Sequence, residues 1–189
     1  MVAATQEWGS SAIADTPLHL GNVAMGGLFA EGGGHYLHGA SIYCFDDGGS
    51  PPVESRVAVY QGGSLSLGPA DGAGATLLYD FGKIIHPTGA FAWVDVFVSG
   101  PPVLIADNTP IWVCTKADDA GGADYRTETD SGNAGDFQTA RGRFETTGLN
   151  ESPDVSWPSN YPDTDSDFGS WFSFRLIYRK RRGLVTNRG

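Results

Sequence analysis

Short segments in which apolar and polar side chains alternate recur along the chain. In residues 55–61, Val57, Val59 and Gln61 fall on one side and Arg56, Ala58 and Tyr60 on the other. A period of two predicts a β-strand with two distinct faces. The same period predicts a strand over 90–98 with a core-like face of Ala92, Val94, Val96 and Val98. It also predicts a closing strand over 168–178 with Phe172, Phe174, Leu176 and Tyr178 pointing inward.

Loops rich in glycine, proline and aspartate separate further short apolar runs. Strands are expected within 18–29, 36–45, 76–81, 103–106 and 111–115. Residues 46–52 and 62–75 between them are dominated by turn-forming residues. This spacing predicts an all-β fold, a single jelly-roll-like antiparallel β-sandwich with long glycine- and aspartate-rich loops.

The length and composition fit one domain with two flanking segments. The 189 residues are 40% hydrophobic, which supplies one core and not two. We expect residues 1–17 to form an N-terminal arm, 18–178 the sandwich, and 179–189 a basic C-terminal tail. Residues 117–136 carry six acids and few large apolar side chains, so a mobile acidic loop is expected there.

The charge of the chain disfavours two classes of partner. Twelve Lys and Arg against 22 Asp and Glu give a net charge of −10, which repels nucleic acid and anionic membranes alike. No run of apolar residues is long enough to span a bilayer. Residues 1–14 lack the basic start and apolar run of a signal peptide, so we expect synthesis in a cytosol.

Basic residues gather at the end of the chain. Six of the 12 lie in the last 15 positions, which hold no acid. Two interpretations stay open: the tail packs on the acidic body of another subunit, or it is a solvated end. The candidate partner contacts are Trp8 in the arm and Arg179, Lys180, Arg181 and Arg182 in the tail.

Cysteine and metal chemistry have few candidates. Cys44 and Cys114 lie in apolar runs, which favours two buried thiols over a disulfide. His35 and His38 are three positions apart, and a strand would point them to opposite faces. The alternating carboxylates of Asp163, Asp165 and Asp167 are candidate calcium ligands, but the run departs from the EF-hand pattern. A solvated turn is the favoured interpretation of this run, and a bound calcium ion is the weaker alternative; no other cofactor is expected.

The sequence does not predict catalysis, but one segment is a candidate for sugar binding. No nucleophile elbow or phosphate-binding loop occurs, so we predict a protein that is not an enzyme. Trp157, Asn160 and Tyr161 lie in a proline-flanked segment that could display aromatic rings and an amide to a sugar. The favoured alternative is that these rings fold back over one end of the sandwich.

Four segments in order carry a resemblance to a known group of modules. They are 20–43 with its Leu-His-Gly-Ala-Ser-Ile-Tyr run, Arg-Val-Ala-Val-Tyr at 56–60, Pro-Val-Leu-Ile-Ala-Asp-Asn-Thr-Pro-Ile-Trp-Val at 102–113, and Trp-Pro-Ser-Asn-Tyr at 157–161. Their order over 18–178 resembles the jelly-roll β-sandwich modules of bacterial surface and secreted glycan-associated proteins. The resemblance implies a sandwich fold and says little about function.

The context of the domain is similar instead to that of tailed-phage virion proteins. A small acidic β-sandwich made without a signal resembles capsid decoration, head-fibre or tail components assembled in the host cytoplasm. The first hypothesis is therefore a non-catalytic virion protein that contacts a major capsid or tail protein and forms a homo-oligomer. The alternative is a carbohydrate-binding or adhesion module that binds a surface glycan.

Overall fold

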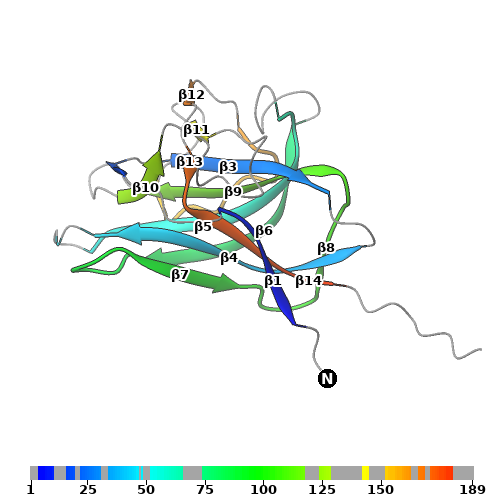
Figure 1. Ribbon diagram of the computed structural model, residues 1–189, viewed down its shortest axis with the longest axis horizontal. Helices are drawn as coiled ribbons and strands as arrows, with labels where there is room; N and C mark the ends of the chain where they lie inside the picture. The colour runs from blue at the N-terminus through cyan, green and yellow to red at the C-terminus, as the bar shows by residue number, and fades with distance from the viewer. Residues whose placement is uncertain are drawn as a thin grey trace, which may run out of the picture.

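The protein folds entirely into β-structure in the part described. The computed structural model describes residues 4–10, 16–19, 22–30, 34–46, 48, 52–65, 74–117, 124–128, 142–144, 152–162, 166–168 and 171–180. Within these ranges every regular element is a strand and none is a helix (Figure 1). The strands are β1 (Thr5–Gly9), β2 (Thr16–His19), β3 (Asn22–Phe29), β4 (His35–Phe45), β5 (Glu54–Gly62), β6 (Ala75–Ile85), β7 (Ala92–Phe97), β8 (Val103–Ile105), β9 (Thr109–Ala117), β10 (Asp124–Glu128), β11 (Gly142–Phe144), β12 (Ser166–Phe168), β13 (Trp171–Phe172) and β14 (Phe174–Lys180).

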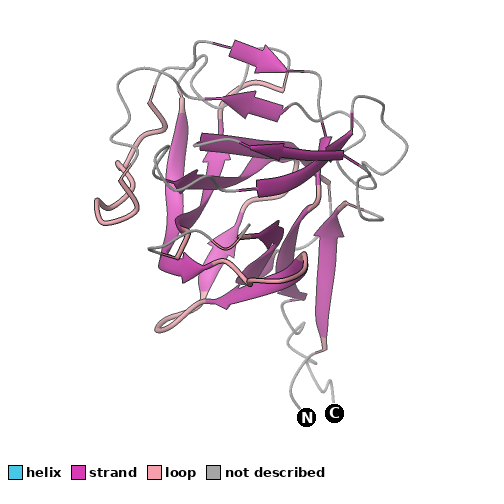
Figure 2. Cartoon of the chain, turned by 90° about the vertical axis from the view of Figure 1, so that its left-hand side faces the viewer, coloured by secondary structure: helices cyan, strands magenta, loops and turns pink. Residues whose placement is uncertain are grey.

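The strands form two antiparallel sheets that pack face to face (Figures 1 and 2). In sheet A, β4 lies between β14 and a second neighbour made of β7 and β8, and β1 flanks β14. β10 pairs with β4, β2 and β13 in the same sheet. Sheet B has the order β12-β11-β3-β9-β5-β6. The chain passes repeatedly between the sheets, so the predicted β-sandwich is confirmed.

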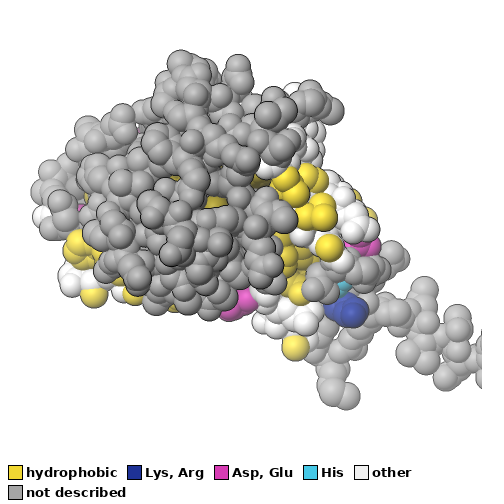
Figure 3. Space-filling view, turned by 45° about the horizontal axis from the view of Figure 1, so that its top comes forward, with side chains coloured by type: hydrophobic (Ala, Val, Ile, Leu, Met, Phe, Trp, Pro, Cys, Tyr) yellow, Lys and Arg dark blue, Asp and Glu magenta, His cyan; other side chains and the backbone are white. Residues whose placement is uncertain are grey.

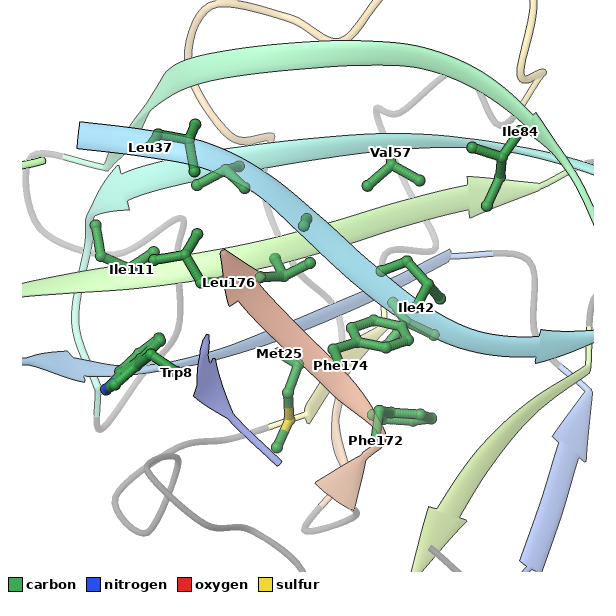
Figure 4. Packing of buried hydrophobic residues seen from close by; sticks show 14 of the residues in the cluster. Trp8, Met25, Leu37, Ile42, Val57, Ile84, Ile111, Phe172, Phe174 and Leu176 are labelled. Carbon is green, nitrogen blue, oxygen red and sulfur yellow. The ribbon is translucent and has the colours of Figure 1, made fainter. Parts of the chain in front are cut away.

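The main core lies between the two sheets (Figure 4). The inward set of β14 is the one predicted, with Phe172 of β13 next to Phe174, Leu176 and Tyr178. The β7 residues Val94 and Val96 also pack on this core, as their alternation predicts. Opposite them, sheet B contributes Met25, Val57, Val59, Ile111 and Val113. Period-two alternation therefore identifies the core face of the central strands.

A second apolar cluster lies on the other face of sheet B. It consists of Ala24, Ala58, Tyr60, Ala75, Trp112, Cys114, Trp157 and Tyr161. Residues 152–162, the covering segment, supply the last two rings and shield this face from solvent. Trp112 packs directly over Gly26 of the neighbouring strand, where a Cβ would collide with the indole ring. Glycine is required at position 26 because the large ring occupies that space.

The N-terminal residues are part of the sandwich. β1 pairs with β14, and Trp8 is 5% exposed with its ring 5.5 Å from that of Phe29. The expectation that Trp8 lies outside the sandwich is wrong, because its indole fills the end of the core. The segment expected to be an acidic loop contains β10, so at least residues 124–128 are sheet; residues 118–123 and 129–141 lie outside the described part.

None of the described segments forms a helix long and apolar enough to cross a membrane.

Candidate functional site

The two aromatic rings that the sequence offers for sugar binding, Trp157 and Tyr161, are buried. Trp157 is 4% exposed and Tyr161 5%, and the two pack around Tyr60 at centroid distances of 5.8 and 5.1 Å. The ring faces are occupied by protein, so they are not open to a sugar. Asn160 is exposed, but it stands apart from any open ring of this segment. The covering segment is thus closed over the face of sheet B and not over an end of the sandwich.

Polar contacts hold the covering segment in place. Arg56 Nε donates to both carboxylate oxygens of Asp80 at 2.9 Å, and one of these oxygens also accepts from the backbone N–H of Trp157 at 3.0 Å. Arg56 Nη1 also donates to the Pro153 carbonyl oxygen at 3.2 Å. The Tyr60 hydroxyl donates to the Pro158 carbonyl oxygen at 2.6 Å. These bonds give the segment a structural function.

Partly exposed aromatic rings gather on the outer face of sheet A. We call Tyr43, Phe45, Phe91, Trp93 and Phe97 the aromatic strip. The register of β4 against β7 places Tyr43 opposite Trp93 and Gly39 opposite Phe97. Because Val94 and Val96 point into the core, the alternate residues of β7 must point outward. Phe97 is 54% exposed, and the other four rings are partly exposed.

Four of these rings form one continuous group. The Tyr43 ring lies 5.2 Å from that of Trp93 and stacks on Phe91 at 5.7 Å with an interplanar angle of 19°. Phe45 lies 5.1 Å from Phe91. Contacts between rings fix their orientation, so a ligand meets a platform that is already arranged.

A polar row crosses the sheet next to this group. Arg175 of β14 places its guanidinium carbon 4.0 Å from the centroid of the Trp93 ring and pairs with Glu7 at 2.8 Å. Ser41 donates to Asp95 at 2.6 Å. Asp95 is itself exposed. The row places hydrogen-bond donors and acceptors beside the rings.

The end of the strip at Phe97 lies beside basic residues. Phe97 lies 5.3 Å from the His38 ring, and Nη2 of Arg179 is 3.0 Å from His38 Nε2. A Cβ at Gly39 would collide with the carbonyl oxygen of Val96 and lie 3.1 Å from Phe97. Position 39 therefore holds glycine where the paired strand β7 lies close to it. A space-filling view shows open hydrophobic side chains and, separately, a basic group beside a histidine (Figure 3).

Burial lowers the pKa of His38 below its usual value, and the neighbouring Arg179 guanidinium lowers it further. A hydrogen bond from Arg179 requires that His38 Nε2 be unprotonated, so this pair is arranged for a neutral imidazole.

A serine and a histidine also meet inside the protein. Ser55 Oγ lies 2.6 Å from His86 Nε2, and His86 Nδ1 lies 3.2 Å from the Phe45 carbonyl oxygen. Ser55 is 0% exposed and His86 1%. A nucleophile and its base must reach a substrate, and this pair lies where only protein surrounds it. Its contacts join β5, β4 and the segment after β6.

The candidate metal residues do not converge where the structure describes them. His35 is buried in the core and His38 lies at the outer face, as their spacing predicts. Within the described ranges, no three histidine, cysteine or acidic side chains form a metal-sized group. Asp163 and Asp165 lie outside the described residues, and Asp167 is described only as part of β12.

The cysteines and the basic tail are also placed. Cys44 and Cys114 are free and buried, which confirms two buried thiols. Cys44 lies in the core between the two sheets, and Cys114 lies in the second cluster on the other face of sheet B. Burial raises the pKa of Cys44 to about 12. Arg179 and Lys180 belong to β14 and do not start a separate tail. Arg181 and Arg182 lie outside the described residues.

The aromatic strip was visible in the sequence only in part. The set of Phe91, Trp93, Asp95 and Phe97 is the outward partner of the core-like face of β7. An outward face with three aromatic rings is unusual for a solvated strand, and that feature could have indicated the site. Its contacts with β4 and β14 depend on pairings between residues more than 40 positions apart.

Comparisons with known proteins identify the fold alone. No family model matches the chain, and no curated protein does. Two solved structures of Cwp84 share the fold with TM-scores of 0.56 each. One is a clostridial cysteine protease after propeptide cleavage, 9% identical, and the alignment covers 94% of this chain and 40% of that one. The other holds the cysteine protease and lectin-like domains of this surface-layer-associated protein of Clostridium difficile, 10% identical over 94% and 36% of the two chains. This chain thus spans less than half of either.

Proposed function

We propose that the protein is a non-catalytic binding module that recognises carbohydrate through the aromatic strip of sheet A. The observation that carries this proposal is the arrangement of partly exposed rings on the outer face of sheet A, with Trp93 at its centre. Aromatic faces pack against the apolar faces of sugar rings. A sheet holds such rings in fixed positions, which reduces the ordering cost of binding.

The polar row supports the same ligand class. A sugar presents hydroxyl groups around its apolar faces, and these need donors and acceptors close to the stacking rings. Asp95 supplies an exposed carboxylate, and Ser41 and Arg175 lie beside it. The exposed Asp95 carboxylate can accept further hydrogen bonds from sugar hydroxyls, which an apolar partner does not supply.

The length of the strip favours a chain of sugars. Trp93 and Phe97 are four strand residues apart, a distance of about 13 Å at the usual rise. A single sugar unit does not cover that distance, whereas an oligosaccharide does. The lectin-like domains named for one of the Cwp84 structures are consistent with such a ligand on a similar fold.

The test compares two truncations of partly exposed side chains. Affinity electrophoresis against a panel of soluble polysaccharides is run on the wild type, Trp93→Ala and Ile85→Ala. Ile85 is 63% exposed on sheet B and serves as the control. We expect retention by at least one polysaccharide, lost in Trp93→Ala and kept in Ile85→Ala. Equal retention of both variants would contradict a site on the aromatic strip.

A second candidate function is a structural role in a phage virion, in contact with a capsid or tail protein. The observation that favours it is the exposure of Phe97 and Leu104, both 54% exposed, beside each other along β4. Exposed apolar side chains near basic residues fit a protein interface.

The virion role and the carbohydrate-binding role predict different oligomeric states. A virion protein is expected to form a defined homo-oligomer or to copurify with particles, and Phe97→Ser is then expected to dissociate it. Light scattering of the full chain and of a chain ending at Lys180, which keeps β14 intact, checks this. A monomer that is absent from particles would exclude this role.

A further inference from the structure

Arg179, at the end of the aromatic strip, has no acidic partner in the part of the chain that the structure describes. Among the described residues, no carboxylate lies within 4.0 Å of the Arg179 guanidinium, and its Nε is buried without a hydrogen bond. Its one described polar contact is with His38, at 3.0 Å. A desolvated donor without an acceptor is costly in a folded protein. The Nε atom is enclosed, but the Arg179 side chain as a whole is partly exposed, so an acceptor from outside the chain can approach the guanidinium at its Nη atoms.

The other half-buried arginines show the contrast. Arg56 is held by both oxygens of Asp80, and Arg175 by Glu7. Both guanidinium groups are thereby neutralised by the protein itself. Arg179 is left with a histidine, which cannot supply negative charge. An anion at this place would complete the same kind of pair that the other two make.

The charge around this position is positive on the described surface. Burial, and then the Arg179 guanidinium, lower the pKa of His38, which favours the neutral imidazole beside Arg179. Lys180 follows on the same strand and is exposed. Two carboxylates of the outer face contact other side chains and not Arg179: Asp95 accepts from Ser41, and Glu7 accepts from Arg175.

An open ring lies beside the free guanidinium. The Phe97 ring lies 5.3 Å from the His38 ring, and Phe97 is 54% exposed, so a ligand can reach it. We propose that this corner, formed by Arg179, His38 and Phe97, binds an acidic sugar, with the guanidinium holding the sugar carboxylate and the Phe97 ring packing on the sugar face. This inference rests on the proposed function, because it assigns a ligand class to one end of the same strip.

The planar fork of arginine matches a carboxylate, which gives two parallel hydrogen bonds in fixed geometry. The net charge of −10 opposes any polyanion at long range, but exposed charges are screened beyond about 8 Å at physiological salt. Groups in contact with the ligand therefore decide the selectivity.

The test uses two polysaccharides that differ only at the carboxyl group. Polygalacturonate and its carboxyl-reduced form are titrated by calorimetry into the wild type, Arg179→Gln, Lys180→Gln and Trp93→Ala. Arg179→Gln and Lys180→Gln change the net charge equally, and melting curves check that each variant is folded. We expect the wild type to prefer polygalacturonate by about tenfold or more, the usual scale for charge-assisted hydrogen bonds. That preference is expected to vanish in Arg179→Gln and to persist in Lys180→Gln.

Three results would overturn the inference. Equal binding of both polysaccharides by the wild type, lost in Trp93→Ala, would leave the aromatic strip as the site and remove the acidic sugar. An equal loss in Arg179→Gln and Lys180→Gln would show attraction by net charge and no site at the corner. Binding of neither polysaccharide, together with no retention on the wider panel, would reject the proposed function itself.

Discussion

Arg175 lies over the ring of Trp93, with its guanidinium carbon 4.0 Å from the ring centroid, although the two residues are on strands that do not pair. β4 lies between β14 and β7, and its small Ser41 side chain lets the arginine reach across. Glu7 fixes the other side of the guanidinium at 2.8 Å. The orientation of the central ring of the strip is therefore set from three strands.

A double-mutant cycle measures this contact. Arg175→Gln and Trp93→Ala are expected to couple by about 1 kcal/mol, since a partly exposed cation over an indole contributes on that scale. Urea unfolding of the wild type, both single variants and the double variant gives the coupling energy. A coupling near zero would mean that the two groups are neighbours without mutual stabilisation.

Asp80 is predicted to be the main anchor of the covering segment. Its carboxylate pairs with Arg56 and also accepts the backbone N–H of Trp157. Asp80→Ala leaves a mostly buried guanidinium unpaired, so we expect a loss of about 3 kcal/mol in the free energy of unfolding. Lys83→Ala is the control, because its pairs with Glu54 and Asp154 are exposed. Chemical denaturation checks both, and similar losses would contradict an anchoring function of Asp80.

Local alternation predicts which side chains share a face of a strand. It does not predict which segment packs on that face or whether the face is exposed to solvent. The inward set of β14 and the two faces of β5 follow from a period of two. The sequence also holds a sign that both faces of sheet B are covered: Ile111, Trp112, Val113 and Cys114 are consecutive and apolar, which is typical of a strand buried on both sides. That sign indicates that the outer face of sheet B is covered, but only the structure shows that Trp157 and Tyr161 belong to the segment that covers it.

The placement of Trp8 could not be read from its neighbours. Glycine and serine follow it, and such a context is typical of a terminal arm. The strand forms because β14 offers an open edge to pair with β1, and the indole then fills the end of the core beside Phe29. This edge is created by the last strand of the chain, so the information lies about 170 residues away in sequence.

Trp157 is predicted to act on stability and not on sugar affinity. Its ring packs on Tyr60 and its indole N–H donates to the Arg56 carbonyl oxygen at 3.2 Å. Trp157→Ala removes a large buried side chain, a change that costs about 3–5 kcal/mol. Thermal unfolding checks the loss, and affinity electrophoresis at a temperature where the variant is folded is expected to show unchanged retention. Lost retention by a folded variant would return the covering segment to the list of ligand contacts.

The two thiols are expected to be unreactive in the folded protein. Both are buried, and burial raises the pKa of Cys44 to about 12 and that of Cys114 well above its usual value. Because thiolates react and thiols do not, an aromatic disulfide reagent is expected to label neither cysteine in native buffer and both in denaturant. Labelling is followed by absorbance, with Cys44→Ala and Cys114→Ala to assign each thiol. Fast labelling of either in the native state would contradict its burial.

Lys116 is predicted to make stability depend on pH. It is 0% exposed and lies 5.3 Å from the centroid of the Trp157 ring. Burial, and then the nearby Arg56, lower the pKa of Lys116 from 10.5 to about 8, against an opposing effect of Asp80. Below pH 8 both the folded and the unfolded chain carry the charge, so the full cost of burying it is present. Between pH 8 and 10.5 the unfolded chain binds more protons than the folded one, so this group increases stability as the pH rises.

Lys116→Met isolates that effect. The variant has no ammonium to bury, so we expect it to be more stable than the wild type at pH 7 and to lose that advantage progressively above pH 8. The cysteines and Tyr60 also titrate in alkaline solution, but they occur in both proteins, and the difference between the two removes their shared contribution. Urea unfolding of both proteins at several pH values from 7 to 10.5 measures the gap. A gap that stays constant over this range would mean that Lys116 keeps its charge in the folded protein because the Trp157 ring and its other contacts compensate for burial.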